Sequence, residues 1–379
     1  MRRETAAGVL IVDAGERSAV AACECLARAG YRVGTASGER QVPARWSRFS
    51  SASYELPNPR ANGLRFAERV AEIAAEDGYA TALACSEGSL WAISRNREPF
   101  GAAVDLGLPP AAVVERCTDK LVLTEAAGPA GLAAPETAVC DSIEEAVVAA
   151  ERLGFPVVLK PRRTVFSHGE EAVHLASSLV ADEAALRAEL PGAGLPCLIQ
   201  RRETGSMLSV AGVMANGELL AATVSRYLRT WPPEGGPVSF SRSIEAPPSL
   251  LDSVARLASA IGWNGIFELE LIELADGRPA VLDFNPRIYG SLALAVKAGT
   301  PLPAIWCDWL LQGKQDRSRG RAGVYYRWED AELRNALKLL RAGKPAQAIS
   351  VMRPRSPVAH AYFRWYDPLP AAVRASKLF

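Results

Sequence analysis

The chain contains 379 residues, of which 49% are hydrophobic and 22% are charged, proportions typical of a globular protein with two or three domains. Its 43 Lys and Arg residues balance 42 Asp and Glu residues, which leaves a net charge of +1. This balance gives no electrostatic reason to expect nucleic acid or an anionic membrane as partner. Small molecules or proteins are therefore the expected partners.

The seven cysteines are an odd number, and none of their spacings is typical of a zinc site. We predict reduced thiols that pack mainly as small core residues. No apolar run approaches the ~18 residues of a membrane helix, and the N-terminal MRRETAAG leads directly into the strand-like GVLIVDAG. The expected location is the cytoplasm, and a homodimer is one expected assembly.

Residues 8 to about 115 alternate strand-like and helix-like segments, a pattern that predicts a parallel sheet with helical crossovers. The first turn from strand to helix contains only Gly15, whereas a dinucleotide-binding fingerprint needs three glycines. A nicotinamide dehydrogenase is therefore disfavoured. The expected strands are 8–13, 31–36 and 81–85, and the expected helices are 17–29 and 63–77.

A second unit begins near residue 115. Thr118 and Asp119 can cap a helix that carries Lys120 and continues to about residue 127. Lys160 lies near the end of a buried strand that proline terminates, a place where a lysine is more often a solvated charge than a functional one. The neighbouring elements are a strand at 135–140, a helix at 142–153 and the strand itself at 154–161.

The following stretch is expected to contain two loops and a hairpin. Residues 162–170 are polar and predict a loop, and the Pro- and Gly-rich residues 228–243 predict a second loop that could act as a lid. Asn216-Gly217 marks a hairpin between them. The expected helices are 181–190, 248–261, 293–312 with a break near 301–303, and 330–341; the expected strands are 197–200, 207–214 and 218–227; residues 313–320 form a linker.

The most informative stretch is 263–291, where apolar and polar residues alternate on both sides of Asp276-Gly277, a strong hairpin signal. A two-residue turn fixes the register of the two strands. Three carboxylates and an amide would then share one face within roughly 5 to 8 Å of one another. The opposed pairs counted outward from the turn are Ala275 and Arg278, Glu270 and Asp283, and Glu268 and Asn285.

Opposed carboxylates repel each other unless a cation lies between them, and hard oxygen ligands suit Mg²⁺ or Mn²⁺. Magnesium usually binds one or two protein carboxylates together with substrate phosphates, which indicates a nucleotide. The hairpin alone leaves open the alternative of a solvated acidic face.

Four features occur in one order: the Rossmann-like unit, Lys120 at a helix start, Val-Val-Leu-Lys-Pro at 157–161, and Asp-Phe-Asn-Pro-Arg at 283–287. Over about residues 8–312 this order resembles the ATP-grasp superfamily, which includes carboxylate-amine ligases related to carbamoyl phosphate synthetase, biotin carboxylase and D-alanine-D-alanine ligase. The resemblance implies an α/β fold of the α+β ATP-grasp type. The implied domains are a Rossmann-like pre-ATP-grasp domain (1–115), a small subdomain (116–195), a large subdomain (196–320) and a C-terminal extension (321–379).

The resemblance also implies roles for individual residues. Nucleotide phosphates would be contacted by two lysines, and adenine and ribose by the strand around residues 198–203. A metal would be held at the hairpin, and an arginine after it would stabilise the transferring phosphoryl group. The corresponding residues are Lys120 and Lys160; Gln200, Arg201 and Glu203; Glu270, Asp283 and Asn285 with Glu268 as auxiliary; and Arg287.

The phosphate-covering segment 162–171, RRTVFSHGEE, departs from the family pattern because it contains few small residues. His168 within it could contact phosphate or substrate, or be an exposed loop histidine. Arg229 and Arg242 could grip a substrate carboxylate, or be surface arginines of a loop.

The function implied is an ATP- and Mg²⁺-dependent (or Mn²⁺-dependent) ligase that activates a small carboxylic acid as an acylphosphate and joins it to an amine. The chemistry needs no nucleophilic side chain. The alternatives are another phosphoryl-transfer enzyme on this scaffold and a nucleotide-binding scaffold protein without chemistry. A biotin-dependent carboxylase is disfavoured because the chain has no Met-Lys carrier site.

Overall fold

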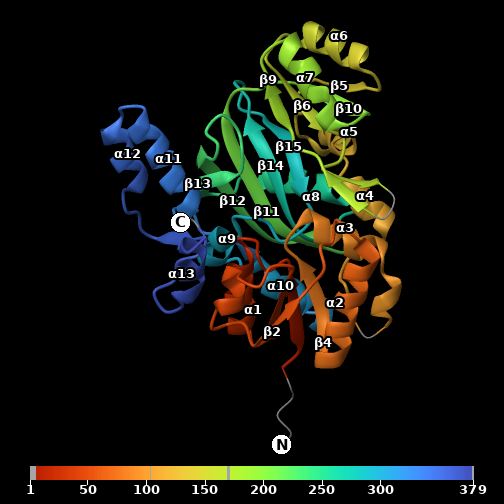
Figure 1. Cartoon of the computed structure of the whole chain (residues 1–379), viewed down its shortest axis with the longest axis vertical. Helices are drawn as coiled ribbons and strands as arrows, with labels where there is room; N and C mark the ends of the chain where they lie inside the picture. Colours follow the sequence, from red (N-terminus) through yellow and green to blue (C-terminus); the bar gives the residue numbers. More distant parts are fainter. Residues whose placement is uncertain (1–5, 103, 169–170, 378–379) are drawn as a thin grey trace, which may run out of the picture.

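The computed structural model describes residues 6–102, 104–168 and 171–377, and places them in three sheets and a separate hairpin (Figure 1). The N-terminal sheet has four strands, all parallel, so the predicted parallel sheet is confirmed. Its strand order is β3 (Ala52–Glu55), β2 (Arg32–Ser37), β1 (Gly8–Val12) and β4 (Tyr79–Ala84), with helices α1 (Ala19–Arg28), α2 (Gly63–Asp77) and α3 (Glu87–Arg95) and 3-10 turns η1 (Pro43–Trp46) and η2 (Glu98–Phe100).

A small lobe at the top of Figure 1 contains an antiparallel sheet and its own apolar core. Its strands in order are β5 (Thr137–Cys140), β10 (Cys197–Arg201), β6 (Val157–Pro161) and β9 (Ser178–Val180), covered by α6 (Ile143–Leu153) and α7 (Glu183–Ala193). The predicted loop at 162–170 is wrong, because β7 (Val165–His168) and β8 (Glu171–His174) pair as a hairpin. Buried Val165 and Ala172 anchor that hairpin, which explains why a polar stretch is ordered as strands.

The central sheet carries the predicted hairpin at one edge. Its order is β15 (Pro279–Asn285), β14 (Gly265–Glu273), β11 (Ser206–Ala215), β12 (Glu218–Thr230), β13 (Val238–Ile244), β17 (Tyr325–Arg327) and β18 (Val358–His360), with β16 (Ser318–Arg319) on β12. The predicted loop at 228–243 is shorter than expected, since β12 extends through Thr230 and β13 begins at Val238. Proline and glycine are confined to the short connection between these strands.

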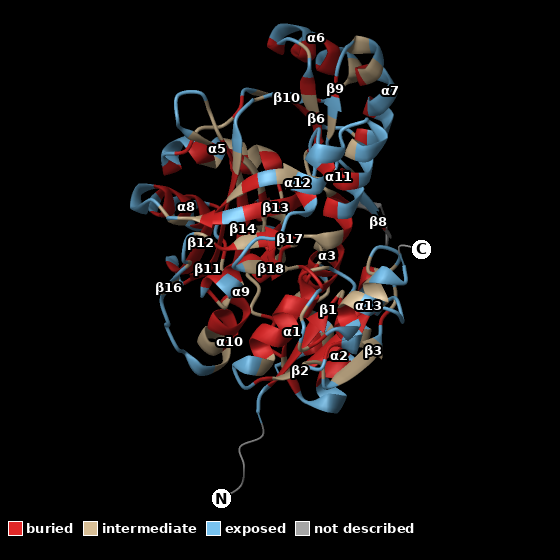
Figure 2. Cartoon of the chain, turned by 90° about the vertical axis from the view of Figure 1, so that its left-hand side faces the viewer, coloured by how far each residue is buried: buried red, intermediate tan, exposed pale blue. Residues whose placement is uncertain are grey.

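Helices cover both faces of the central sheet, and Figure 2 shows the buried residues concentrated between them. One face holds α4 (Ala111–Cys117), α5 (Lys120–Ala130) and α8 (Pro248–Ala260), while the other holds α9 (Leu292–Ala298) and α10 (Leu302–Gln312). The packing thus groups α5 with the large sheet, not with the small lobe. The predicted break near 301–303 is confirmed, and Gly299 ends α9 with φ +99°.

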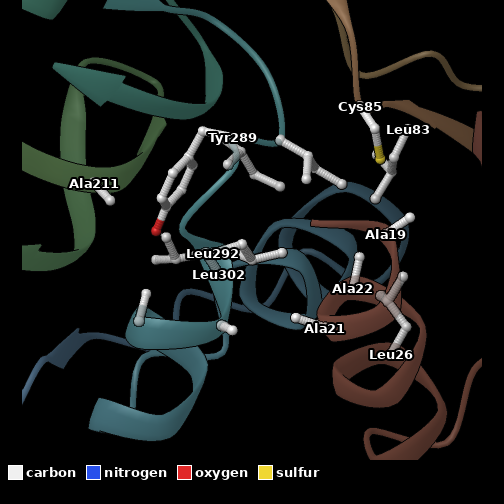
Figure 3. Packing of buried hydrophobic residues seen from close by; sticks show 14 of the residues in the cluster. Ala19, Ala21, Ala22, Leu26, Leu83, Cys85, Ala211, Tyr289, Leu292 and Leu302 are labelled. Carbon is white, nitrogen blue, oxygen red and sulfur yellow. The ribbon is translucent and has the colours of Figure 1, made fainter. Parts of the chain in front are cut away.

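The core that includes α9 and α10 extends without interruption into the N-terminal domain. In Figure 3, Tyr289 lies between Ala211 of β11 and Leu292 of α9, and Ala22 and Leu26 of α1 complete the cluster. The Rossmann-like domain and the large sheet therefore share one hydrophobic core, which fixes their relative position.

The C-terminal tail is part of this frame, because β17 and β18 belong to the central sheet and α13 (Leu369–Ala375) packs on η1. Asp367, buried before α13, accepts hydrogen bonds from Ser47 Oγ at 2.6 Å and Arg48 N at 3.0 Å. The tail thereby connects the N-terminal domain to the large sheet. A helical arm of α11 (Glu329–Arg341) and α12 (Pro345–Met352) projects from it (Figure 1).

All seven cysteines are buried and free, as predicted. Among the helices of the described residues, none combines the length and apolarity needed to cross a membrane.

The fully buried carboxylate of Glu332 in α11 gives a test of how the tail is anchored. Glu332 pairs with Arg229 and accepts a hydrogen bond from Ser239 Oγ at 2.9 Å. Glu332→Ala should lower the free energy of unfolding by about 3 kcal/mol, because removing one partner of a buried pair leaves the other unpaired. Glu218→Ala, which breaks an exposed pair with Arg317, should cost less than about 1 kcal/mol in the same urea titration. Equal losses in the two variants would contradict this anchoring.

Candidate active site

The hairpin at the sheet edge has the predicted pairs, Glu270 opposite Asp283 and Glu268 opposite Asn285. The predicted pairing of Ala275 with Arg278 is wrong. Leu274 N donates to Arg278 O at 2.9 Å, so residues 275–277 form a three-residue turn whose last member, Gly277, has φ +82°. This turn shifts the pairing by one position, and a bulge in β15 shifts it back.

The bulge leaves Leu282 without a partner on β14, because Leu271 pairs with Val281 and Glu270 pairs with Asp283. The freed carbonyl of Leu282 accepts a hydrogen bond from Lys160 Nζ at 3.0 Å. Lys160 comes from β6 of the small lobe, so this bond crosses between the two lobes. Burial lowers the pKa of Lys160 to about 8, although Asp283 opposes that shift.

Lys120, the first residue of α5, approaches the same carboxylate from another side. Its Nζ donates to Thr164 Oγ1 at 2.8 Å and lies 3.9 Å from Asp283 Oδ1. Asp119 caps α5 by accepting from Leu121 N, as predicted, and also pairs with Arg162 at 2.8 Å. Two lysines, one from α5 and one from β6, thus converge on the hairpin.

Glu270 is held by Tyr227 of β12, whose hydroxyl donates to Glu270 Oε1 at 2.9 Å. Burial, together with the neighbouring carboxylate of Asp283, raises the pKa of Glu270, and the Tyr227 bond opposes the rise. Ser209 of β11 is the partner of Glu270 in the sheet, and its hydroxyl forms a hydrogen bond of 3.0 Å with that of Ser225 of β12. The polar face therefore continues inward across the sheet.

Glu268 is turned toward the chain that follows the hairpin. It accepts from Ser291 Oγ at 3.1 Å, and burial with the charge of Glu270 raises its pKa to about 8. Asn285 Nδ2 lies 3.5 Å from Glu268, and Asn285 Oδ1 accepts from Arg287 Nη2 at 3.0 Å. These bonds orient Asn285 and support an auxiliary position for Glu268.

Within the described ranges, no three His, Cys, Asp or Glu side chains are grouped closely enough to hold a metal ion by themselves. The expected convergence of three carboxylates is therefore not a complete metal cage. Glu270, Asp283 and Asn285 do offer hard oxygens on one face, and a divalent cation would relieve the repulsion that raises the pKa of Glu270. This donor set fits Mg²⁺, which takes few protein ligands when phosphates supply the others.

The predicted nucleotide strand is β10, in the middle of the small-lobe sheet. Gln200 is buried there, and its Nε2 donates to Thr137 Oγ1 at 3.0 Å. Arg201 is exposed and pairs with Glu136 at 2.6 Å, while Glu203 follows the strand and is half-buried. Gln200 and Arg201 belong to β10, and Glu203 follows it. Leu198 of the same strand pairs with Lys160 of β6.

The two arginines expected to grip a substrate lie on strands, away from the hairpin. Arg229 is committed to Glu332, and its guanidinium lies 4.3 Å from the Phe240 ring centroid. Arg242 is exposed, with its guanidinium 5.5 Å from the Tyr325 ring centroid. The side chain of His168 lies outside the described part of the structure.

A cavity of about 760 Å³ lies between the carboxyl ends of β1, β2 and β4 and Arg287. Sequence reasoning missed its acidic residues Asp13, Glu16 and Glu87, and it also missed Tyr227. Asp13, Glu16 and Glu87 follow or flank the ends of parallel strands. Ligands usually bind at the carboxyl ends of such strands, so this position was the signal in the sequence. Tyr227 could not be found by counting register, because a bulge in the β11–β12 hairpin breaks the count.

Comparison with known families matches residues 196–332 to the family described as ATP-grasp in the biosynthetic pathway with Ter operon. A similar sequence is the carbamoyl phosphate synthase large chain of Clavibacter sepedonicus, with 26% identity over 227 residues. That alignment covers 55% of this chain but 20% of the relative, so the chain spans about a fifth of the curated relatives it matches.

Similar folds occur among solved structures. The L-amino acid ligase of Bacillus licheniformis aligns with a TM-score of 0.61 and 17% identity, covering 82% of this chain and 75% of that one. The biotin carboxylase domain of Hydrogenobacter thermophilus 2-oxoglutarate carboxylase, determined as a dimer with MgADP, ADP and bicarbonate, aligns with a TM-score of 0.63 and 16% identity. It covers 84% of this chain and 73% of that one, and at these identities the likeness establishes the fold.

The lowered pKa of Lys160 predicts a pH dependence of stability. Between pH 8 and 10.5 the unfolded state binds more protons at Lys160 than the folded state, so folding should gain stability as pH rises. In urea titrations with EDTA, the wild type should gain at most roughly 3 kcal/mol relative to Lys160→Met over this range. Lys338→Met, at an exposed ion pair, is the matched control and should follow the wild-type curve. Parallel curves for wild type and Lys160→Met would exclude a perturbed lysine.

Proposed function

We infer, from the premise that this chain belongs to the ATP-grasp superfamily, that it is an ATP-dependent ligase. It activates the carboxylate of a small molecule as an acylphosphate and transfers the acyl group to an amine. The observation that carries the proposal is the Glu270–Asp283 pair, which faces Lys120 and Lys160 from two other elements. A solvated acidic face would not need two buried lysines beside it.

Each residue of the cluster has a role suited to its chemistry. Lys120 and Lys160 act as point charges for the terminal phosphates of ATP. Glu270, Asp283 and Asn285 would hold Mg²⁺, which when bound neutralises phosphate charge. Arg287 presents delocalised positive charge after the hairpin, where it would stabilise the transferring phosphoryl group. Gln200, Arg201 and Glu203 are the proposed contacts to adenine and ribose.

The proposed reaction has two steps. A carboxylate oxygen attacks the γ-phosphorus of ATP, the bond to the β-phosphate oxygen breaks, and ADP leaves. The amine then attacks the acyl carbon, and phosphate leaves as the amide forms and a proton is released. Positioning and charge neutralisation supply most of the acceleration, which fits a site without a nucleophilic side chain.

The comparisons support a C–N bond-forming ligase in general terms, since similar chains are named carbamoyl phosphate synthase, L-amino acid ligase and N5-carboxyaminoimidazole synthetase. A protein with this fold was determined in complex with MgADP, which supports ATP and Mg²⁺ as the cofactors in this proposal. The acid and the amine are small molecules in this proposal, and the location is the cytoplasm, where buried reduced thiols persist.

Substitutions at the opposed carboxylates test the metal site. Glu270→Gln and Asp283→Asn should each reduce Mg²⁺-dependent ADP formation about 1,000-fold, because the charges that hold the cation are lost without a change in shape. The assay crosses a panel of carboxylic acids with amines and separates nucleotides by chromatography. Glu273→Gln, which lies at the same hairpin but pairs with Arg226, should keep the wild-type rate. Unchanged turnover in Glu270→Gln or Asp283→Asn would remove the metal-site assignment.

The mass of the product separates the alternatives. An amide indicates the ligase, whereas a stable phosphorylated acid indicates another phosphoryl-transfer enzyme. Nucleotide binding without ADP formation over the whole panel would favour a scaffold protein.

The hydroxyl of Tyr227 tests how Glu270 is tuned. In Tyr227→Phe the carboxylate loses the hydrogen bond that stabilises its charged form, so the pKa of Glu270 should rise further. Mg²⁺ affinity, measured by calorimetry with ADP present, should fall about tenfold, and the acid limb of the activity profile should move to higher pH. Tyr325→Phe, on a distant strand, is the control. An unshifted acid limb in Tyr227→Phe would show that this hydrogen bond does not tune the site.

A further inference from the structure

The cavity beside Arg287 contains charges that the proposed phosphoryl transfer does not use. It lies at the carboxyl ends of parallel strands, the edge at which such sheets bind ligands. Its volume of about 760 Å³ is in the range of small-molecule sites. Its walls come from the N-terminal domain, the β7–β8 hairpin, Arg287 in the segment that follows β15, and the C-terminal segment.

The N-terminal wall is anionic. Asp13 follows β1, Glu16 precedes α1 and Glu87 begins α3. Asp13 accepts a hydrogen bond from Ser86 Oγ, and among the described residues none of the three carboxylates has a Lys or Arg nitrogen within 4.0 Å. By contrast, Glu39 in the same cavity is neutralised by Lys377.

The three carboxylates belong to the same electrostatic neighbourhood as the hairpin. Enclosure by protein raises the pKa of Glu16, and the positive charge of Arg287 opposes that rise. Enclosure likewise raises the pKa of Glu87, opposed by Lys120 and Arg287. The anionic wall therefore faces the phosphoryl-transfer residues across the cavity. Arg60, which also lines the cavity, offsets part of the charge of Asp13 and Glu16, and Arg17 offsets part of that of Glu16, but in the described residues neither arginine lies within 4.0 Å of these carboxylates.

The opposite wall contains a cation that can donate further hydrogen bonds. Arg287 lines the cavity, and its Nε is shielded from solvent yet donates to no acceptor in the described part of the chain. Its other nitrogens donate to Ile288 O and Asn285 Oδ1. A guanidinium has five N–H groups, so the remaining N–H groups of Nη1 and Nη2 can bind a carboxylate ligand in the cavity.

We propose that the acid substrate is a zwitterion of the amino-acid type, whose carboxylate is held by Arg287 and whose ammonium group is held by Asp13, Glu16 and Glu87. This inference rests on the proposed function, because the carboxylate at Arg287 is the one that is phosphorylated. A dicarboxylate without an amine would place negative charge against the anionic wall. An amino acid satisfies both walls with one molecule.

The first experiment measures ADP formation by the full chain with ATP, Mg²⁺ and an amine pool. The probes are the twenty common L-amino acids, each beside its N-acetyl derivative and its deamino acid. At least one amino acid should give a kcat/KM about tenfold or more above those of both its analogues, because only the amino acid presents an ammonium group. Equal or greater activity with the deamino acids would overturn the proposal.

Charge-neutralising variants locate the effect. Glu16→Gln and Glu87→Gln should each raise the KM of the preferred amino acid about tenfold and leave the KM of its deamino analogue within about twofold. Glu39→Gln removes a carboxylate from the same cavity that Lys377 already neutralises, so it should preserve the discrimination. Loss of discrimination in Glu39→Gln alone, or a changed Mg²⁺ requirement in Glu16→Gln with discrimination intact, would refute the assignment.

Failure of the ligase proposal can be told apart from failure of this one. If no acid supports ADP formation, binding of the same pools to the protein with ADP and Mg²⁺ is followed by saturation-transfer NMR. Binding of an amino acid but not of its N-acetyl derivative, lost in Glu16→Gln, upholds the zwitterion site without turnover. Absence of binding, or equal binding of both, rejects it.

Discussion

Two half-buried carboxylates on neighbouring strands, Glu270 and Asp283, repel each other, and much of the surrounding structure compensates for that repulsion. Tyr227 donates to one carboxylate, and Lys120 and Lys160 place positive charge beside the other. The compensation is incomplete, since the pKa of Glu270 remains raised. A site held in this condition favours the arrival of a divalent cation, whereas a fully neutralised one would not.

The parts of the chain around this pair have two separate hydrophobic cores. The N-terminal domain and the large sheet share a hydrophobic core, and the tail joins them again through Asp367 and α13. The small lobe has a core of its own and meets the hairpin through polar contacts such as Lys160 with the Leu282 carbonyl. Phosphates that draw Lys160 away from that carbonyl would change how the lobes are held together. If Lys160 binds phosphates as proposed, ligand binding and lobe position are linked through this lysine.

The predictions from sequence succeeded where a local pattern determines the structure. Alternation fixed the faces of β14 and β15, and proline after Lys160 ended β6 near its true limit. They failed where tertiary contacts decide. Nothing local distinguishes a polar loop from the β7–β8 hairpin, or shows that Arg229 reaches Glu332 about a hundred residues later. The acidic cavity wall was missed for the same reason, because its members come from different strand ends.

The β14–β15 hairpin has the predicted pairs at Glu268 and Glu270 although its predicted turn is wrong. A three-residue turn alone would have moved the partners of Glu270 and Glu268 by one position, and would have sent the side chains of β15 to the opposite face. The bulge at Leu282 restores the face and, in the same step, releases a carbonyl from the ladder. That carbonyl is the acceptor for Lys160, so the irregularity that corrects the register also builds the contact between the lobes. A regular hairpin with a two-residue turn would keep both carboxylates opposed but would offer Lys160 no acceptor.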